Sequence, residues 1–243
     1  MIRIFVDPAA LVAGELVVRG DEHHYLSRVR RARPGEAIEL VDGAGRRAAA
    51  TIAALGEATT TLVAGPPEPV LAALPRVRAL VPLIKGDRME LCLEKLVEVG
   101  ADAIVVWPAA RSVARLDDAR RESRIARYRA LAQAAARQSG RAQVPDVAAA
   151  SDLAAALATL PDGARLVLDP ASDATLDAAL GLGRCGTSCH TDIAIISGPE
   201  GGLTTDERDQ LAGFAPIGLG PRVLRAETAP VVAVALIRAA TRS

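Results

Sequence analysis

Short apolar segments separated by glycine and proline fill the first 69 residues. Their length and spacing predict β-strands at residues 2–6, 15–19, 37–41, 47–55 and 59–64. Asp42-Gly43-Ala44-Gly45 favours a hairpin turn between the third and fourth strands, and Asp21 is placed to cap a short helix. Several short strands with such turns are typical of a small β-barrel. The proline-rich residues 66–69 predict a stiff linker, so we expect a domain boundary after residue 69.

After residue 69 the apolar pattern changes to alternating strands and helices. Strands are predicted at residues 77–84, 103–107, 165–168, 193–197 and 216–219. Helices are predicted to start at Asp87, Asp117, Ser151, Thr204 and Glu227, and those starting at Asp117 and Glu227 to run over residues 117–138 and 227–242. Strands that alternate with helices indicate an α/β domain with a parallel sheet.

Two of these helix starts carry a polar residue followed by glutamate three positions later, which is typical of a capping box. The pairs are Asp87 with Glu90, and Thr204 with Glu207. The helix after Asp87 has an apolar stripe and a glycine stop at Gly100. The stripe consists of Met89, Cys92, Leu93, Leu96 and Val97.

Composition narrows the class of protein. Half of the 243 residues are hydrophobic and the formal net charge is zero, which disfavours both a disordered chain and a generic nucleic-acid coat. Arginine is nevertheless clustered, with nine arginines and three acids between Arg111 and Arg141, and a second group at residues 28–33. Such clusters either bind phosphates or form solvated helix faces, and the residues alone favour neither.

The cysteines indicate whether the protein binds a metal, and the first residues indicate where in the cell it is expected. Cys92 falls in an apolar helical stripe, whereas Cys185, Cys189 and His190 lack the fourth ligand of a closed zinc site, so we expect no metal. Residues 1–6 lack the layout of a signal peptide, and no apolar run approaches the length of a membrane span. We therefore expect a cytoplasmic protein without a membrane partner.

Two strand ends in the second half combine glycine, proline and charged residues. Gly198-Pro199-Glu200-Gly201-Gly202 follows one strand, and Leu219-Gly220-Pro221-Arg222-Val223-Leu224-Arg225-Ala226-Glu227-Thr228-Ala229 overlaps the end of another. Open α/β sheets bind ligands at such ends, and glycines let the backbone approach a flat ligand closely. The alternative is a plain strand–helix turn, because the first block lacks both phosphate-binding spacings. The same lack disfavours a nicotinamide dehydrogenase.

These two blocks resemble the C-terminal motifs of the ribosomal RNA small subunit methyltransferase E family. The resemblance continues in Lys85-Gly86-Asp87-Arg88-Met89-Glu90 and in Gln138-Ser139-Gly140-Arg141, and covers essentially the whole chain. It implies a PUA-like RNA-binding β-barrel at residues 1–69 and a SPOUT α/β domain with a parallel sheet and a trefoil knot at residues 70–243. It further implies a homodimer that uses S-adenosyl-L-methionine to methylate N3 of a specific uridine in 16S rRNA, on the small ribosomal subunit or an assembly intermediate.

The resemblance also implies roles for individual residues. The cofactor-binding residues would be Leu168, Gly198, Pro199, Glu200, Gly201, Gly202, Leu219, Gly220, Leu224, Arg225 and Thr228. Our hypothesis for catalysis is that Arg225 or Arg222 stabilises a uracil anion, while Glu227 or Glu200 orients the base or accepts its proton. The alternative for both glutamates is a structural capping role. Because aromatic residues are scarce, RNA binding would depend on cationic contacts to phosphates by Arg28, Arg31, Lys85, Arg88, Arg111, Arg115 and Arg141.

Some positions depart from the family pattern. Ala110 precedes Arg111 where the family usually has an acid, Asp169 replaces the more frequent glutamate, and Pro230 replaces a typical alanine. Two other functions also stay open at the sequence level. One is a SPOUT enzyme that methylates a different RNA position, such as a ribose hydroxyl, and the other is a non-catalytic RNA-binding assembly factor.

Overall fold

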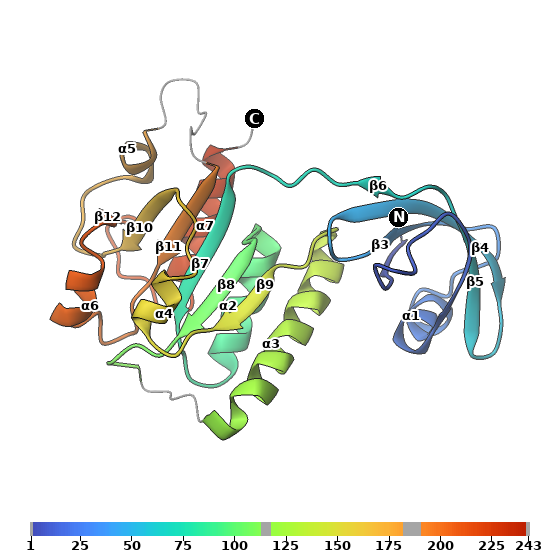
Figure 1. Ribbon diagram of the computed structural model, residues 1–243, viewed down its shortest axis with the longest axis horizontal. Helices are drawn as coiled ribbons and strands as arrows, with labels where there is room; N and C mark the ends of the chain where they lie inside the picture. The colour runs from blue at the N-terminus through green and yellow to red at the C-terminus, as the bar shows by residue number, and fades with distance from the viewer. Residues whose placement is uncertain (1, 113–117, 182–190, 242–243) are drawn as a thin grey trace. The chain divides into compact units, whose positions relative to one another are not determined.

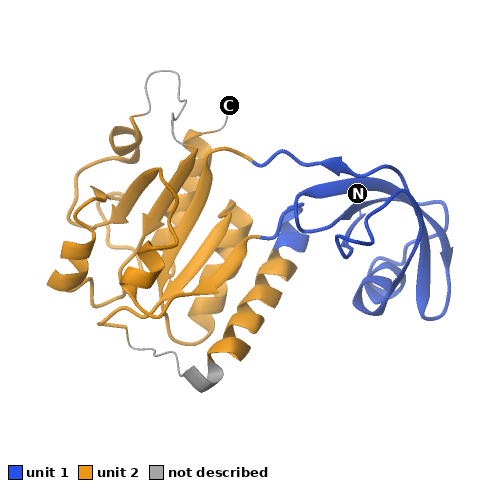
Figure 2. Cartoon of the chain, viewed as in Figure 1, with its two compact units in different colours: residues 1–72, 136–144 blue, residues 73–135, 145–243 orange. Residues whose placement is uncertain are grey.

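The structure, a computed structural model, describes residues 2–112, 118–181 and 191–241. The chain forms two compact units, shown in blue and orange in Figure 2. Unit 1 comprises Met1–Ala72 with Ala136–Val144, and unit 2 comprises Ala73–Ala135 with Pro145–Ser243. A single cut in the sequence does not describe this division, because residues 136–144 belong to unit 1. The boundary after residue 69 stays a prediction.

Unit 1 is built around a sheet whose strand order is β1-β3-β4-β5-β2, with β6 added beside β4. Its strands are β1 (Ile2–Phe5), β2 (Gly14–Arg19), β3 (Ala37–Val41), β4 (Arg46–Leu55), β5 (Thr59–Ala64) and β6 (Glu68–Pro69). β1 and β3 are parallel, whereas the other pairs are antiparallel. A short helix, α1 (Gly20–His24), continues into a π-helical turn, η1 (Tyr25–Val29).

The core of unit 1 follows from the alternation of side chains along its strands. In β4 the residues Ala48, Ala50 and Ile52 are buried, while the residues between them are exposed. They pack with fully buried side chains that include Ile4 and Leu62. The predicted strands and the hairpin between β3 and β4 are thereby confirmed.

Two local predictions for unit 1 are wrong. The helix after β2 starts at Gly20 and follows Arg19, and no side-chain capping bond is present there among the described residues, so Asp21 lies in the first turn and caps nothing. The proline-rich stretch is more than a linker, since Glu68 and Pro69 pair with Arg47 and Arg46 of β4. Proline tolerates this position because β6 is a short edge strand.

Unit 2 is an α/β layer structure with a parallel sheet in the order β12-β10-β11-β7-β8-β9 (Figure 1). The strands are β7 (Arg76–Pro82), β8 (Ala103–Trp107), β9 (Asp146–Ala149), β10 (Ala164–Leu168), β11 (Asp192–Ile196) and β12 (Ala215–Ile217). The helices are α2 (Asp87–Val99), α3 (Asp118–Ser139), α4 (Leu153–Leu157), α5 (Leu176–Leu180), α6 (Thr205–Gln210) and α7 (Ala229–Ala240), and the last turn of α3 belongs to unit 1. α2 packs against α7, which contacts β7 and β11. The predicted parallel α/β fold is confirmed.

Helix α2 has the predicted apolar stripe, but the backbone conformation of Gly86 determines where the helix begins. Its predicted apolar stripe is buried throughout, and Gly100 ends the helix in the left-handed conformation with φ 106°. Its predicted capping box is wrong. Gly86 is the N-cap with φ 69°, a conformation that suits glycine, so Asp87 is already inside the helix, and no side-chain capping bond is present among the described residues.

The starts of α4, α6 and α7 agree with the predictions to within two residues, whereas Asp117, the predicted start of α3, lies outside the described residues. Thr204 and Glu207 form the predicted capping box of α6. Asp152, one residue after the predicted Ser151, caps α4 by accepting a hydrogen bond from the N–H of Ala155. α7 starts at Ala229 and holds Pro230 in its first turn, where a missing N–H costs little.

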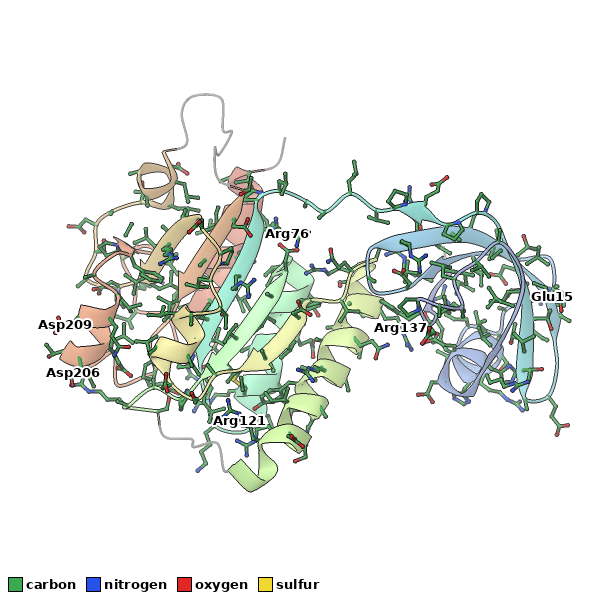
Figure 3. The ribbon with its side chains drawn as sticks, in the orientation of Figure 1. Glu15, Arg76, Arg121, Arg137, Asp206 and Asp209 are labelled. Atoms are coloured by element: carbon green, nitrogen blue, oxygen red, sulfur yellow. The ribbon has the colours of Figure 1, made fainter. Side chains whose placement is uncertain are left out.

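Arginines of unit 2 stabilise the sheet at several carbonyl groups. From α3, Arg121, labelled in Figure 3, donates to the carbonyl of Ala149 on edge strand β9 at 2.8 Å. Arg129 donates to the carbonyl of Val147 on the same strand at 3.0 Å. From α7, Arg238 donates to the carbonyls of Pro75 and Gly100 and pairs with Asp102. Part of the arginine cluster between residues 111 and 141 thus has a structural role.

Candidate functional site

A cavity of about 590 Å³ lies where β10, β11 and β12 end. Its walls come from the turn after Leu168, from the Gly198–Gly202 turn and the start of α6, and from the loop that follows Ile217. All three strands are parallel, so their carboxyl ends meet at one edge of the sheet. The cavity therefore lies where this class of fold binds its ligands.

Most of the predicted cofactor-binding residues line this cavity. They are Leu168, Gly198, Pro199, Glu200, Gly202, Leu219, Gly220, Leu224 and Arg225, and Arg222 joins them. Gly201, Thr228 and Glu227 are not among the described residues that line it. Gly201 instead packs against Arg111, whose guanidinium donates to the Gly201 carbonyl at 3.0 Å. The predicted roles of all these residues stay predictions.

The cavity also has an apolar wall that the sequence pattern did not single out. Leu203, Leu211 and Phe214 line it and belong to the buried core of unit 2. This wall suits the flat, apolar part of a ligand.

Ser197 is a further cavity residue that the sequence pattern did not single out. It ends the buried run of β11, lines the cavity and is only 2% exposed. Its hydroxyl has no hydrogen-bond partner within the described ranges. Buried polar groups are normally hydrogen-bonded, so this hydroxyl is available to a bound ligand.

Asp169 and Arg208 place a charged pair on the cavity wall. The carboxylate of Asp169 accepts hydrogen bonds from the N–H of Ala171 at 2.9 Å and from Arg208 at 3.0 Å. These contacts, with the backbone bond first, hold the pKa of Asp169 below its ordinary value. The wall therefore presents a carboxylate that stays ionised at neutral pH.

A row of charged side chains connects the Gly198–Gly202 turn with the loop that carries Arg225. Arg88, in the first turn of α2, lies 2.9 Å from Glu200 and 3.7 Å from Glu227. Arg225 lies 4.0 Å from the other oxygen of Glu227. Glu227 is buried, and its Oε2 atom accepts no hydrogen bond from the residues that the structure describes. The proposed capping role of Glu227 is wrong, since no side-chain capping bond is made at Thr228, the N-cap of α7, in the described chain.

The predicted RNA contacts fall into several groups. Arg28 and Arg31 in unit 1 and Lys85 in unit 2 are exposed. Arg88 and Arg111 are engaged with Glu200, Glu227 and the Gly201 carbonyl, and Arg141 is partly buried. Arg115 lies outside the described residues.

Two further observations concern membranes and metals. Across residues 2–112, 118–181 and 191–241, no helix is long and apolar enough to span a membrane. In the same ranges no three His, Cys, Asp or Glu side chains gather as they would around a metal ion. Cys185, Cys189 and His190 lie outside the described part of the chain.

Known proteins resemble this chain over nearly its whole length. Residues 72–238 match the RNA methyltransferase domain family, and residues 18–61 match the RNA methyltransferase PUA domain. The ribosomal RNA small subunit methyltransferase E of Mycobacterium bovis is 35% identical, over 96% of this chain and 89% of the relative. The enzyme of the same name from Bacillus subtilis is 35% identical, over 64% of this chain and 62% of the relative.

Solved structures of related proteins resemble this chain over nearly its whole length as well. The Neisseria gonorrhoeae ribosomal RNA small subunit methyltransferase E, bound to S-adenosyl methionine, is 29% identical with a TM-score of 0.83, over 98% of this chain and 97% of that one. A Legionella pneumophila protein in complex with the bound cofactor SAM is 26% identical with a TM-score of 0.82, over the same shares. The predicted PUA-like and α/β domains are confirmed, and the chain belongs to the ribosomal RNA small subunit methyltransferase E family.

Proposed function

We propose that this protein transfers the methyl group of S-adenosyl-L-methionine to N3 of a specific uridine in 16S rRNA. The observation that carries the proposal is the cavity at the ends of β10, β11 and β12, with Arg222 and Arg225 on its wall. Its volume of about 590 Å³ lies within the usual range for small-molecule sites. A relative of the same family holds S-adenosyl methionine in its structure.

The residues present fit this cofactor. Leu203, Leu211 and Phe214 offer an apolar surface for an adenine ring, and Ser197 offers a buried hydroxyl that has no partner among the residues the structure describes. The glycines of the Gly198–Gly202 turn let backbone amides approach a ligand closely. When bound, S-adenosylmethionine supplies a methyl group on a positively charged sulfur.

The chemistry of uracil sets the tasks of the protein side chains. N3 carries a proton and its lone pair is delocalised, so the base becomes a good nucleophile only when that proton leaves. Arg225, or Arg222, stabilises the negative charge that then develops on O2 and O4. The Arg225 side chain is 79% exposed while lining the cavity, so its guanidinium is accessible to an incoming base. Glu227 or Glu200 orients the base or accepts the proton.

RNA is held mainly through phosphates in this proposal. The PUA domain carries the exposed Arg28 and Arg31, and Lys85 is exposed in the methyltransferase domain. Cationic contacts of this kind give affinity that falls as salt concentration rises. They do not select a sequence, so the choice of nucleotide depends on RNA shape and on the base that enters the site.

The proposal extends to the setting in which the enzyme works. As the family resemblance implies, the protein is a cytoplasmic homodimer with a trefoil knot in its C-terminal domain, acting on the small ribosomal subunit or an assembly intermediate. Light scattering on the purified protein tests the dimer, since a monomer at micromolar concentration would contradict it.

The test of the function uses tritiated S-adenosylmethionine and a strain whose own gene for this protein is deleted. Small ribosomal subunits and naked 16S rRNA from that strain are incubated separately with the purified protein, and the product nucleoside is identified by mass spectrometry. We expect 3-methyluridine at one position. A ribose-methylated nucleoside would identify a different RNA methyltransferase. Absence of both label transfer and heat of S-adenosylmethionine binding would indicate a non-catalytic RNA-binding factor.

A further inference from the structure

Four charged side chains form a continuous row beside the cavity, in the order Glu200, Arg88, Glu227 and Arg225. The successive distances between charged atoms are 2.9, 3.7 and 4.0 Å. The two end members line the cavity, whereas neither Arg88 nor Glu227 is among the described residues that do so. The middle of the row therefore supports the cavity from behind and connects two of its loops.

Burial distinguishes the middle pair from an ordinary surface ion pair. The side chains of Arg88 and Glu200 are 43% and 40% exposed, so their contact by itself contributes little to stability. The side chain of Glu227 is 9% exposed, and a buried carboxylate needs a compensating cation. Among the described residues, Arg88 and Arg225 supply the cations within 4.0 Å of it.

The position of Arg88 is fixed by its own helix. α2 follows the left-handed Gly86, buries its apolar stripe and packs against α7, the helix that begins just after Glu227. The ion pair with Arg88 places the carboxylate of Glu227 beside the first turn of α2. One turn further along α2, burial and, to a smaller extent, the charge of Glu227 raise the pKa of the Cys92 thiol.

We propose that Arg88 is a positioning residue for methyl transfer, and not the phosphate contact that the sequence predicts. It holds Glu200 on the Gly198–Gly202 turn and Glu227 on the loop that carries Arg225, so that both loops keep the geometry that the reaction needs. The inference rests on the proposed function, because its effect is read in the methyl-transfer rate.

The chain offers a matched control for this proposal. Arg47 in unit 1 lies 3.7 Å from the buried Glu39, with side-chain exposures of 51% and 7%, which repeats the distance and burial of the pair formed by Arg88 and Glu227. Glu39 also keeps a second arginine, Arg3, which donates a hydrogen bond to it, whereas the second arginine of Glu227, Arg225, lies 4.0 Å away. Arg47→Ala therefore measures what the loss of such a cation does to folding alone.

The experiment compares Arg88→Ala, Arg88→Lys and Arg47→Ala in the tritium assay, with melting temperatures measured in parallel. Misplaced catalytic groups lower turnover by large factors, so we expect kcat of Arg88→Ala to fall by about 10- to 100-fold. Arg88→Lys should recover part of this loss, since it keeps the charge but not the planar fork. Arg47→Ala should leave kcat unchanged.

A triple variant makes the test independent of folding. Adding Arg88→Ala to a Glu200→Gln, Glu227→Gln double variant leaves neither carboxylate as an unpaired charge, and it should slow turnover no further if Arg88 acts through these two carboxylates. Independent, multiplying effects would overturn the proposal. So would a normal kcat combined with weaker 16S rRNA binding and a salt dependence shallower by about one charge, which would indicate a phosphate contact. A wild-type protein that transfers no methyl group would refute the proposed function and this inference with it.

Discussion

The carboxylate of Glu207 accepts a hydrogen bond from the backbone N–H of Ala110 at 2.8 Å, across 97 positions in the sequence. Its other oxygen accepts from the N–H and the hydroxyl of Thr204, at 2.8 and 3.1 Å. One buried side chain thus caps α6 and also holds the loop after β8. Leu203, a residue of the apolar cavity wall, directly precedes the Thr204 that this carboxylate binds.

Replacing Glu207 with alanine should therefore destabilise the protein. The change leaves three donors without their acceptor, and we expect the free energy of unfolding to fall by about 2 kcal/mol. Urea denaturation measures it. Asp209→Ala is the control, because Asp209 projects from α6 away from the sheet (Figure 3) and surface changes usually stay within about 0.5 kcal/mol. Equal free energies of unfolding for the two variants would contradict the stabilising role of the Glu207 hydrogen bonds to Ala110 and Thr204.

Gly218→Ala tests a close backbone approach beside the cavity. A methyl group at Gly218 would lie 2.1 Å from the carbonyl oxygen of Ser172, on the turn that follows β10. One of the two segments must move, so we expect weaker S-adenosylmethionine binding and a loss of stability of about 2 kcal/mol. Calorimetry and urea denaturation report the two effects.

Gly213→Ala is the matched control for that variant. No described heavy atom outside its immediate neighbours lies within 4 Å of a methyl group added at Gly213. It should bind the cofactor like the wild type. If Gly218→Ala also binds normally, then the turn after β10 does not form the cofactor wall.

Arg225→Ala should abolish most methyl transfer while the fold is kept. Its side chain is largely exposed, so little packing is lost, but a donor aimed at developing charge is worth about 10²- to 10³-fold in rate. The tritium assay measures turnover, and circular dichroism checks the fold. Near-normal turnover would remove Arg225 from the mechanism and leave Arg222 as the candidate.

Cys92 provides a prediction about pH. Burial, with a smaller contribution from Glu227, raises the pKa of its thiol from 9.0 to about 12. At pH 8 the thiolate population of the folded protein should be lower by about 10³-fold than that of the unfolded chain, so a thiol reagent should modify Cys92 mainly after unfolding. A Cys185→Ser, Cys189→Ser background leaves Cys92 as the single thiol for this measurement.

The same shift affects stability in a defined direction. Because the folded pKa lies above the unfolded one, the thiol favours the folded state fully below pH 9, and this contribution is lost as pH rises from 9 toward 12. Compared with Cys92→Ala, the wild type should lose stability more steeply in that window. Parallel slopes would mean that the thiol is not buried in solution.

The apolar pattern predicted most strands and helices, because strands and helices differ in apolar periodicity and each element ends at a recognisable residue such as glycine or proline. The α2 stripe and the Thr204 capping box are local features of the sequence, so they could be recognised there. The start of α2 could not, because the left-handed conformation of Gly86, and not the preference of Asp87 for caps, decides which residue begins the helix.

The site was predictable only where its residues are contiguous. The Gly198–Gly202 turn and the loop with Arg225 follow strand ends and carry visible motifs. Phe214 was missed because an apolar residue in a sequence is read as core, and here it is both core and cavity wall. The pairing of Arg88 with Glu227 joins residues on two separate elements, and no spacing rule reveals such a contact.

The strand order also affects how the parallel sheet forms while the chain is being synthesised. β7 has β11 as one of its neighbours, although more than a hundred residues separate them, and Arg238 near the carboxyl terminus bonds to carbonyls of Pro75 and Gly100. A nascent chain therefore holds an unpaired edge of β7 until β11 has been synthesised, and pairings of such long range form slowly. The residues that line the cavity run as far as Ala229, so a nascent chain completes this edge of the sheet only after β11, β12 and the loop that follows Ile217 have been synthesised.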